Sequence, residues 1–276
     1  MEDLTIAIYC FLDDYLKIGY PKAGSKRKLT DAQIITTALI AARYFGANFV
    51  KARLYLKEVH QFTFPDKSNF NRHLHRLAPT ISNLFFALGQ TLKQLNTSSQ
   101  YLIDSFPVTV CRNIRIPRCK LLDNEAYRGK NTSKREYFYG FKVQVITTVD
   151  GIPVEYFICA GSYADITAFK SMNIDLPAGS ELYADSGYTD YEIEDNYKEL
   201  EQVNLLVSRR SNSKRPDHPA WEFIKKVMRK KIETTFSEIT ALFPRNIHAV
   251  TPQGFILKIV LFIFAFTMDK SLFIAT

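Results

Sequence analysis

The stretch that decides the fold is Tyr101-Leu102-Ile103-Asp104-Ser105-Phe106-Pro107-Val108. Its aromatic and β-branched residues are typical of a buried strand, and the alternation of side chains places Asp104 on the same side as Leu102 and Phe106. A carboxylate among apolar neighbours is costly unless a cation or a hydrogen-bond donor meets it. Asp104 is therefore either an acceptor bound to a nearby loop or a ligand for a cation.

Two other acidic residues occupy places where a rigid element would aim them. Asp185 follows a short strand expected over 181–184 and precedes a glycine turn, at the kind of strand end where α/β sheets place ligands. Glu233 lies in a helix expected over 219–242, on the side opposite its apolar stripe. The plainer interpretations are a turn residue for Asp185 and a surface ion pair with Arg229 for Glu233.

Three carboxylates on rigid elements indicate a defined chemistry. Hard divalent cations such as Mg²⁺ take carboxylate oxygens, and two of them about 3.5–4 Å apart drive in-line displacement at phosphorus. Asp104, Asp185 and Glu233 in a chain of net charge +8 therefore point to phosphoryl transfer on nucleic acid. Asp165 is expected to cap a helix, and with Glu238 it is the alternative acidic residue if one of the three fails.

The basic residues cluster in two segments that adjoin these acidic candidates, although either segment alone is equally typical of a solvated loop. Phosphate contacts beside a metal site are what a DNA-processing enzyme requires. The segment 111–142 contains Arg112, Arg115, Arg118, Lys120, Arg128, Lys130, Lys134, Arg135 and Lys142. The segment 209–231 contains Arg209, Arg210, Lys214, Arg215, Lys225, Lys226, Arg229, Lys230 and Lys231. DNA contacts are expected from Arg209, Arg210, Lys214, Arg215 and Lys230.

Residues 1–97 carry helical signals and few strand signals. A helix over about 50–59, a turn and a polar-faced helix over 69–77 have the form of a helix-turn-helix. In that form Arg72 and Arg76 would face DNA. A surface helix of an ordinary bundle fits the same spacing equally well.

From about residue 98 the pattern changes to strands alternating with helices. Strands are expected over 100–110, 138–149, 153–160, 181–184 and 203–208, and helices over 165–173, 189–200, 219–242 and 252–268. Three antiparallel strands followed by alternating strands and helices predict a mixed sheet with helices on both faces. The final apolar run, 255–268, contains Lys258 and is too short for a bilayer, so it is expected to be a core helix that covers the sheet.

The composition is that of a globular protein, with 46% apolar and 13% aromatic residues. The cysteines form no CxxC pair, which argues against a zinc knuckle. With no signal peptide, the sequence predicts reduced thiols in a cytoplasmic, nucleoid-associated protein without a membrane partner. The four cysteines are Cys10, Cys111, Cys119 and Cys159.

Five stretches occur in a characteristic order and at suitable separations: IDSFPV at 103–108, YGFKV at 139–143, GSYAD at 161–165, YADSGY at 183–188 and RKKIETTF at 229–236. Together they resemble the DDE transposases of bacterial insertion sequences, and most closely the insertion sequence 982 group. The resemblance is most specific over 98–268. The chain departs from the pattern of some branches at Lys226 and Thr240, and Ser186 stands where a basic residue is frequent.

The resemblance implies an α/β fold in which residues 98–276 form a ribonuclease H-like mixed sheet with flanking helices. Residues 1–97 would be a helical domain that recognises DNA. It further implies Asp104, Asp185 and Glu233 as the catalytic, metal-binding triad, with Mg²⁺ or Mn²⁺ as the cofactor and Arg229 at a DNA phosphate.

The implied function is a transposase that cuts and joins the ends of an insertion sequence. Its partners would be the terminal inverted repeats, the target DNA and a second copy of the chain that pairs the two ends. Two alternatives stay open, namely a catalytically silent DNA-binding remnant of a transposase and a structure-selective nuclease on the same fold.

Overall fold

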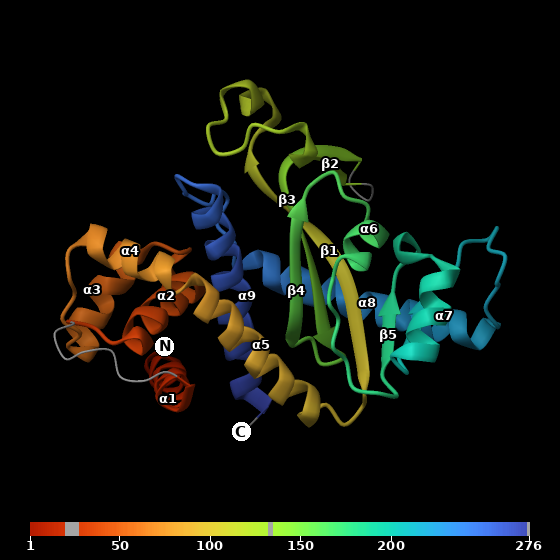
Figure 1. Cartoon of the computed structure of the whole chain (residues 1–276), viewed down its shortest axis with the longest axis horizontal. Coiled ribbons are helices and arrows are strands. Elements are labelled where there is room, and N and C mark those ends of the chain that lie inside the picture. Colours follow the sequence, from red (N-terminus) through yellow and green to blue (C-terminus); the bar gives the residue numbers. More distant parts are fainter. Residues whose placement is uncertain (20–27, 132–134, 275–276) are drawn as a thin grey trace. The chain divides into compact units, whose positions relative to one another are not determined.

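The computed structural model describes residues 1–19, 28–131 and 135–274 (Figure 1). Contacts within the chain divide it into two compact units. The helical unit comprises Met1–Phe85 and Ala241–Thr276, and the sheet unit comprises Phe86–Thr240. The predicted division into functional domains 1–97 and 98–276 stays a prediction. The boundaries of the compact units fall between Phe85 and Phe86, within the helix Ala78–Leu95, and between Thr240 and Ala241.

The helical unit is arranged around α2, whose residues from Ala32 to Ala42 are almost all buried. This helix begins at a capping box, in which Thr30 Oγ1 accepts from the Gln33 backbone and Gln33 Oε1 accepts from the Thr30 backbone. It ends at Gly46, whose φ of 55° lies in the left-handed region. The helices of this unit are α1 (Glu2–Gly19), α2 (Asp31–Phe45), α3 (Phe49–His60), α4 (Lys67–Arg76), the first part of α5 (Ala78–Leu95) and α9 (Pro252–Ile274).

Helix α9 is the buried core helix that the apolar run predicts, and the expectation that it covers the sheet stays a prediction. It packs against α2 and α1 in the helical unit, and Asp269 near its end pairs with Arg43 of α2 at 2.7 Å. A helix that is apolar all round must be buried, but its sequence does not say against which layer. None of the helices in the described ranges is both long and apolar enough to cross a membrane.

The sheet unit contains a mixed sheet, as the alternating pattern predicts, but among the described residues it has six strands, because β2 is an addition to the five expected. The strand order is β2-β3-β1-β5-β6, and β4 also pairs with β3. The pairs that β3 makes with β1, β2 and β4 are antiparallel, whereas β1 with β5 and β5 with β6 are parallel. The strands are β1 (Gln100–Cys111), β2 (Arg128–Asn131), β3 (Glu136–Thr148), β4 (Pro153–Ala160), β5 (Glu181–Ala184) and β6 (Asn204–Val207).

Helices flank this sheet on both faces, with α6 in front of it and α8 behind it in Figure 1. The helices of the sheet unit are α6 (Asp165–Lys170), α7 (Tyr191–Leu200), α8 (Pro219–Ala241) and the second part of α5, and the 3-10 turns are η1 (Asn113–Arg118), η2 (Glu125–Tyr127) and η3 (Ser186–Tyr188). Tyr101 and Ile103 of β1 join the core that contains Phe169 of α6.

The alternate residues of β1 face α8, because successive side chains of a strand point to opposite faces. The Phe106 ring meets the Phe236 ring of α8 at 5.5 Å between centroids. Asp104 belongs to the same set of alternate residues as Phe106. The strand thus separates an apolar core on one face from a carboxylate that lies beneath α8 on the other.

Candidate active site

Asp104 and Asp185 occupy matching positions on neighbouring parallel strands. Leu102 of β1 pairs with Tyr183 of β5, and each aspartate stands two residues further along its own strand. Equal steps along parallel strands keep side chains on the same face of a sheet. The two carboxylates therefore lie on one face, Asp104 within β1 and Asp185 just beyond the carboxyl end of β5.

Ser208 extends this row to β6, and the sequence reasoning missed it. Tyr183 also pairs with Leu206 of β6, and the Ser208 backbone N–H donates to the Ala184 carbonyl at 2.9 Å. Ser208 therefore stands beside Asp185 as Asp185 stands beside Asp104. The signal that could have identified it is its place directly after β6, which is the place that Asp185 has after β5.

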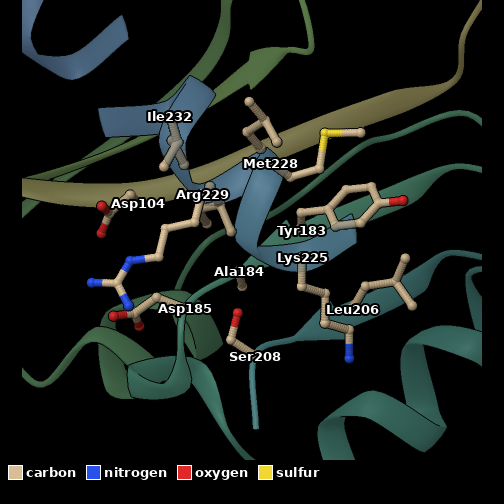
Figure 2. A pocket seen from close by; sticks show the side chains of 12 residues that line it. Asp104, Tyr183, Ala184, Asp185, Leu206, Ser208, Lys225, Met228, Arg229 and Ile232 are labelled. Atoms are coloured by element: carbon tan, nitrogen blue, oxygen red, sulfur yellow. The ribbon is translucent and has the colours of Figure 1, made fainter. Parts of the chain in front are cut away.

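A small cavity of about 20 Å³ opens between these strands and α8 (Figure 2). Room of this size holds one water molecule or one ion. The strand side of its wall includes both aspartates and Ser208, and the helix side includes Met228, Arg229 and Ile232. In Figure 2 the guanidinium end of Arg229 lies between the carboxylates of Asp104 and Asp185.

The electrostatic state of Asp104 reflects this crowding. The pKa of the Asp104 carboxyl is raised to about 7, chiefly by burial and to a smaller extent by the negative charges of Asp185 and Asp165. The Ser105 backbone N–H donates to Asp104 Oδ1 at 2.7 Å and lowers this pKa, as does the positive charge of Arg229. Asp104 is thus a carboxylate that lacks sufficient positive charge around it, which is the condition that a bound cation relieves.

Glu233 is not among the residues that line the cavity. Its side chain is 59% exposed on α8, and its Oε1 accepts from Arg229 Nε at 3.1 Å. This is the surface ion pair that the plainer interpretation predicts. An exposed pair one helical turn apart is weak, so the Glu233 carboxylate exchanges partners at little cost.

Asp165 is close to the site, and the expectation that it caps a helix is wrong. The N-cap of α6 is Ala164, and no side chain caps this helix. The Asp165 Oδ1 instead accepts from Ser105 Oγ at 2.6 Å and from Lys142 Nζ at 3.1 Å. Because Ser105 points away from the face that carries Asp104, Asp165 approaches the pair of aspartates from the far side of the strand.

The aspartate pair fits a hard divalent cation. Within the described part of the chain, no group of three or more His, Cys, Asp or Glu side chains is arranged to hold a metal ion by itself. Mg²⁺ is commonly held by one or two carboxylates, with water and substrate phosphate completing its shell. Two carboxylates at one cavity with room for one ion match that mode of binding.

The basic residues of the second cluster divide into structural and exposed groups. Arg209 and Glu194 form an ion pair in which the side chains are only 10% and 8% exposed. Arg215 forms two bonds to Asp195, of 2.7 and 2.8 Å, and its guanidinium lies over the Tyr191 ring. These two arginines hold α7 and its neighbouring loop together.

Lys225 is also structural. Its buried ammonium donates to Asp217 Oδ2 at 2.7 Å and to the Val207 carbonyl at 2.9 Å, in the wall of the cavity. By contrast, the side chain of Arg210 is exposed, and its Nε lies 3.4 Å from Ser186 Oγ. A cation therefore reaches the residue next to Asp185 although position 186 itself is serine.

The remaining basic candidates are exposed or held elsewhere. In the sheet unit Lys214 and Lys230 are exposed, as Arg72 and Arg76 are on α4 of the helical unit. In the first cluster Lys142 is bound to Asp165, and Arg128 pairs with Glu125 at 2.9 Å. Lys134 lies outside the described residues. All four cysteines are free thiols.

The fold and the two aspartates on neighbouring parallel strands place the chain among α/β proteins with a polar site on a mixed sheet. The sequence matches the family described as "Transposase DDE domain" over residues 95–246, which is more than half of the chain. The chain therefore belongs to the DDE transposase family, and the resemblance is confirmed at that level. A search of curated proteins and a search of solved structures each found no match.

Proposed function

We propose that the protein is a transposase of the insertion sequence 982 group that cuts and joins the ends of its element by metal-dependent phosphoryl transfer. The observation that carries the proposal is the matched placement of Asp104 and Asp185 at one cavity beneath α8. The mixed sheet with helices on both faces is consistent with a ribonuclease H-like fold. Membership of the DDE transposase family supplies the class of reaction.

Asp104 and Asp185 would hold Mg²⁺ or Mn²⁺, and Glu233 would complete the triad after leaving Arg229. A bound ion would supply the positive charge that activates an attacking hydroxyl and stabilises the leaving oxygen. The chain itself keeps the two aspartates in register and encloses them beneath α8. Arg229, once free of Glu233, would meet the phosphate that is attacked.

Exposed cations near the cavity would position the DNA. Arg210 lies beside Ser186, and Lys214 and Lys230 are free of the buried ion pairs that hold other members of the cluster. Arg209 and Arg215 are the weaker candidates for phosphate contact, because each already has an acidic partner. Arg72 and Arg76 would contribute to recognition of the element's ends, and a homodimer would pair two ends.

The test uses a duplex taken from the DNA that flanks the gene, with Mg²⁺ or with a chelator. Asp104→Asn and Glu233→Gln should abolish cleavage and leave binding of the duplex nearly unchanged, because metal ligation and phosphate contacts are separate. Asp150→Asn in the β3–β4 turn and Glu222→Gln on α8 are matched controls, since both side chains are exposed and lie away from the cavity.

Joining of a cut end to target DNA decides between the three candidate functions. A transposase cleaves and joins, a structure-selective nuclease only cleaves, and a silent remnant binds without either reaction. Equal loss of binding and cleavage in a folded Asp104→Asn variant would show that this residue is structural.

A further inference from the structure

A second hollow lies in the helical unit and belongs to none of the residues discussed as catalytic. It is an open cleft of about 1030 Å³. Its wall is built from the start of α3, from α4 and from the segment 244–258, which enters α9. Two segments that are far apart in the sequence, within 45–76 and 244–258, thus form one surface within a single compact unit.

The charge of this cleft is of one sign. Arg53, Lys67, Arg72, Arg76 and Lys258 line it together with two histidines, and no described residue of its lining is Asp or Glu. Arg72 and Arg76 are exposed on α4. A concave surface with low-dielectric walls and one sign of charge concentrates ions of the opposite sign.

Two helix N-termini add to this positive potential. Asn48, the N-cap of α3, and Thr251, directly before α9, both line the cleft. The partial positive charge of a helix N-terminus favours phosphate groups. The side chain of Asn48 accepts from Val50 N and that of Thr251 from Gly254 N, so both helix starts are held firmly in place.

The segment after α8 is fixed to the cleft by Lys258. Its Nζ donates to the His248 carbonyl at 2.5 Å and lies 5.2 Å from the centre of the Phe49 ring. These contacts link α9, the segment 244–258 and α3. Beside them Val250 is 94% exposed, so an apolar side chain stands unburied at the edge of a basic surface.

We propose that this cleft binds the sugar–phosphate backbone of DNA, so that α4 and the segment 244–258 together form one recognition surface. The proposal rests on the proposed function in that DNA is the partner. It adds a site made partly by residues near the C-terminus, which the sequence groups with the catalytic domain. Arginine side chains and helix N-termini both suit phosphate oxygens, and exclusion of acidic residues suits a chain of phosphates.

The test measures binding of a fluorescent duplex of mixed sequence by anisotropy, in chelator, so that no cleavage occurs. Val250→Glu places a carboxylate at the edge of the cleft and should weaken binding about fivefold at roughly 50 mM salt, with a smaller effect at higher salt. Ile18→Glu on α1 is the matched control, because Ile18 is 89% exposed and does not line the cleft. It should bind as the unchanged protein does.

Removal of charge provides a second arm of the same experiment. Replacing Arg72 and Arg76 by Ala should reduce the slope of log K against log salt by about 2, if both contact phosphate. Replacing Lys51 and Lys57 by Ala should change this slope less than replacing Arg72 and Arg76, because these lysines are exposed on α3 outside the cleft. Circular dichroism spectra of all variants establish that they fold.

Three outcomes overturn the proposal. Equal affinity of the Val250→Glu and Ile18→Glu variants means that DNA does not lie in the cleft. Displacement of the duplex by polyglutamate at equal charge concentration means that the cleft prefers acidic protein to phosphodiester. Absence of any duplex binding by the unchanged protein also rejects the cleft, and cleavage with Mg²⁺ then decides the proposed function separately.

Discussion

Asp104 of β1 and Asp185, directly after the parallel strand β5, occupy neighbouring positions, each two residues beyond the pair that Leu102 makes with Tyr183. Like charges at neighbouring positions repel each other, and burial beneath α8 adds to the cost of charging Asp104. The site is therefore least favourable when both groups are ionised and no cation is present. This property leads to a test that needs no DNA.

Removal of the Asp104 charge should stabilise the metal-free protein at high pH. The pKa of Asp104 in the folded protein, about 7, is raised above the usual value near 4. The contribution of this carboxyl to the free energy of unfolding is therefore fully present below about pH 4 and is lost as the pH rises through 7. In chelator, Asp104→Asn should therefore unfold at a higher temperature than the unchanged protein at pH 8. At pH 5 the two melting temperatures should be nearly equal.

Mg²⁺ should raise the melting temperature of the unchanged protein above that of Asp104→Asn at pH 8. A cation that binds the folded state raises its melting temperature, and binding requires ionised carboxylates. The rise on adding Mg²⁺ should thus be larger at pH 8 than at pH 5, and it should be small in Asp104→Asn. A rise of equal size in Asp104→Asn would place the ion elsewhere.

Arg209 and Arg210 should behave differently although they are adjacent in sequence. Arg209→Ala leaves Glu194 buried without its partner and should lower the free energy of unfolding by about 3 kcal/mol or more. Arg210→Ala should leave stability within about 0.5 kcal/mol, because its side chain is exposed. Urea unfolding measures both changes.

DNA binding should show the opposite order. Arg210→Ala should reduce the salt slope of binding by about 1, the amount expected for one phosphate contact. An unchanged slope, with Arg210→Ala still folded, would mean that the exposed side chain beside Ser186 is only solvated.

Much of the sheet unit follows from the sequence because local patterns determine it. The 181–184 strand and the strands and helices around Asp104, Asp185 and Glu233 occur where periodicity predicts them. The register between β1 and β5 does not follow from local patterns, because it depends on pairing between distant segments. That register is what brings Ser208 into the row with the two aspartates.

Charge clusters show the limit of sequence reasoning most clearly. Lys225 and Arg210 belong to the same basic segment, but the first is buried against Asp217 and the second is exposed. Both environments arise from the fold around each residue. The sequence likewise does not determine which helices α9 packs against, because an apolar helix can pack on any suitable apolar layer.

Asp165 offers a test of how the far side of β1 influences the site. Its carboxylate holds Ser105 Oγ and Lys142 Nζ and adds negative charge near Asp104. Asp165→Asn should lower the pKa of Asp104, because one of the charges that raise it is removed. The pH at which the metal-free protein loses stability should shift downward, as followed by thermal unfolding in chelator between pH 4 and pH 8.

Arg229 should affect the reaction more than it affects binding. In the structure its Nε donates a hydrogen bond to Glu233 Oε1, and the residue lines the cavity together with both aspartates. Arg229 is therefore placed to act on the attacked phosphate and not on more distant phosphates of the DNA. Arg229→Gln should therefore reduce cleavage by about tenfold or more while changing duplex affinity by less than about threefold. Lys230→Gln, the exposed neighbour, is the matched control and should weaken binding with little effect on the rate of cleavage in the bound complex. If both variants lose affinity and rate in the same proportion, Arg229 is an ordinary phosphate contact, and the attacked phosphate must be positioned by other residues at the cavity.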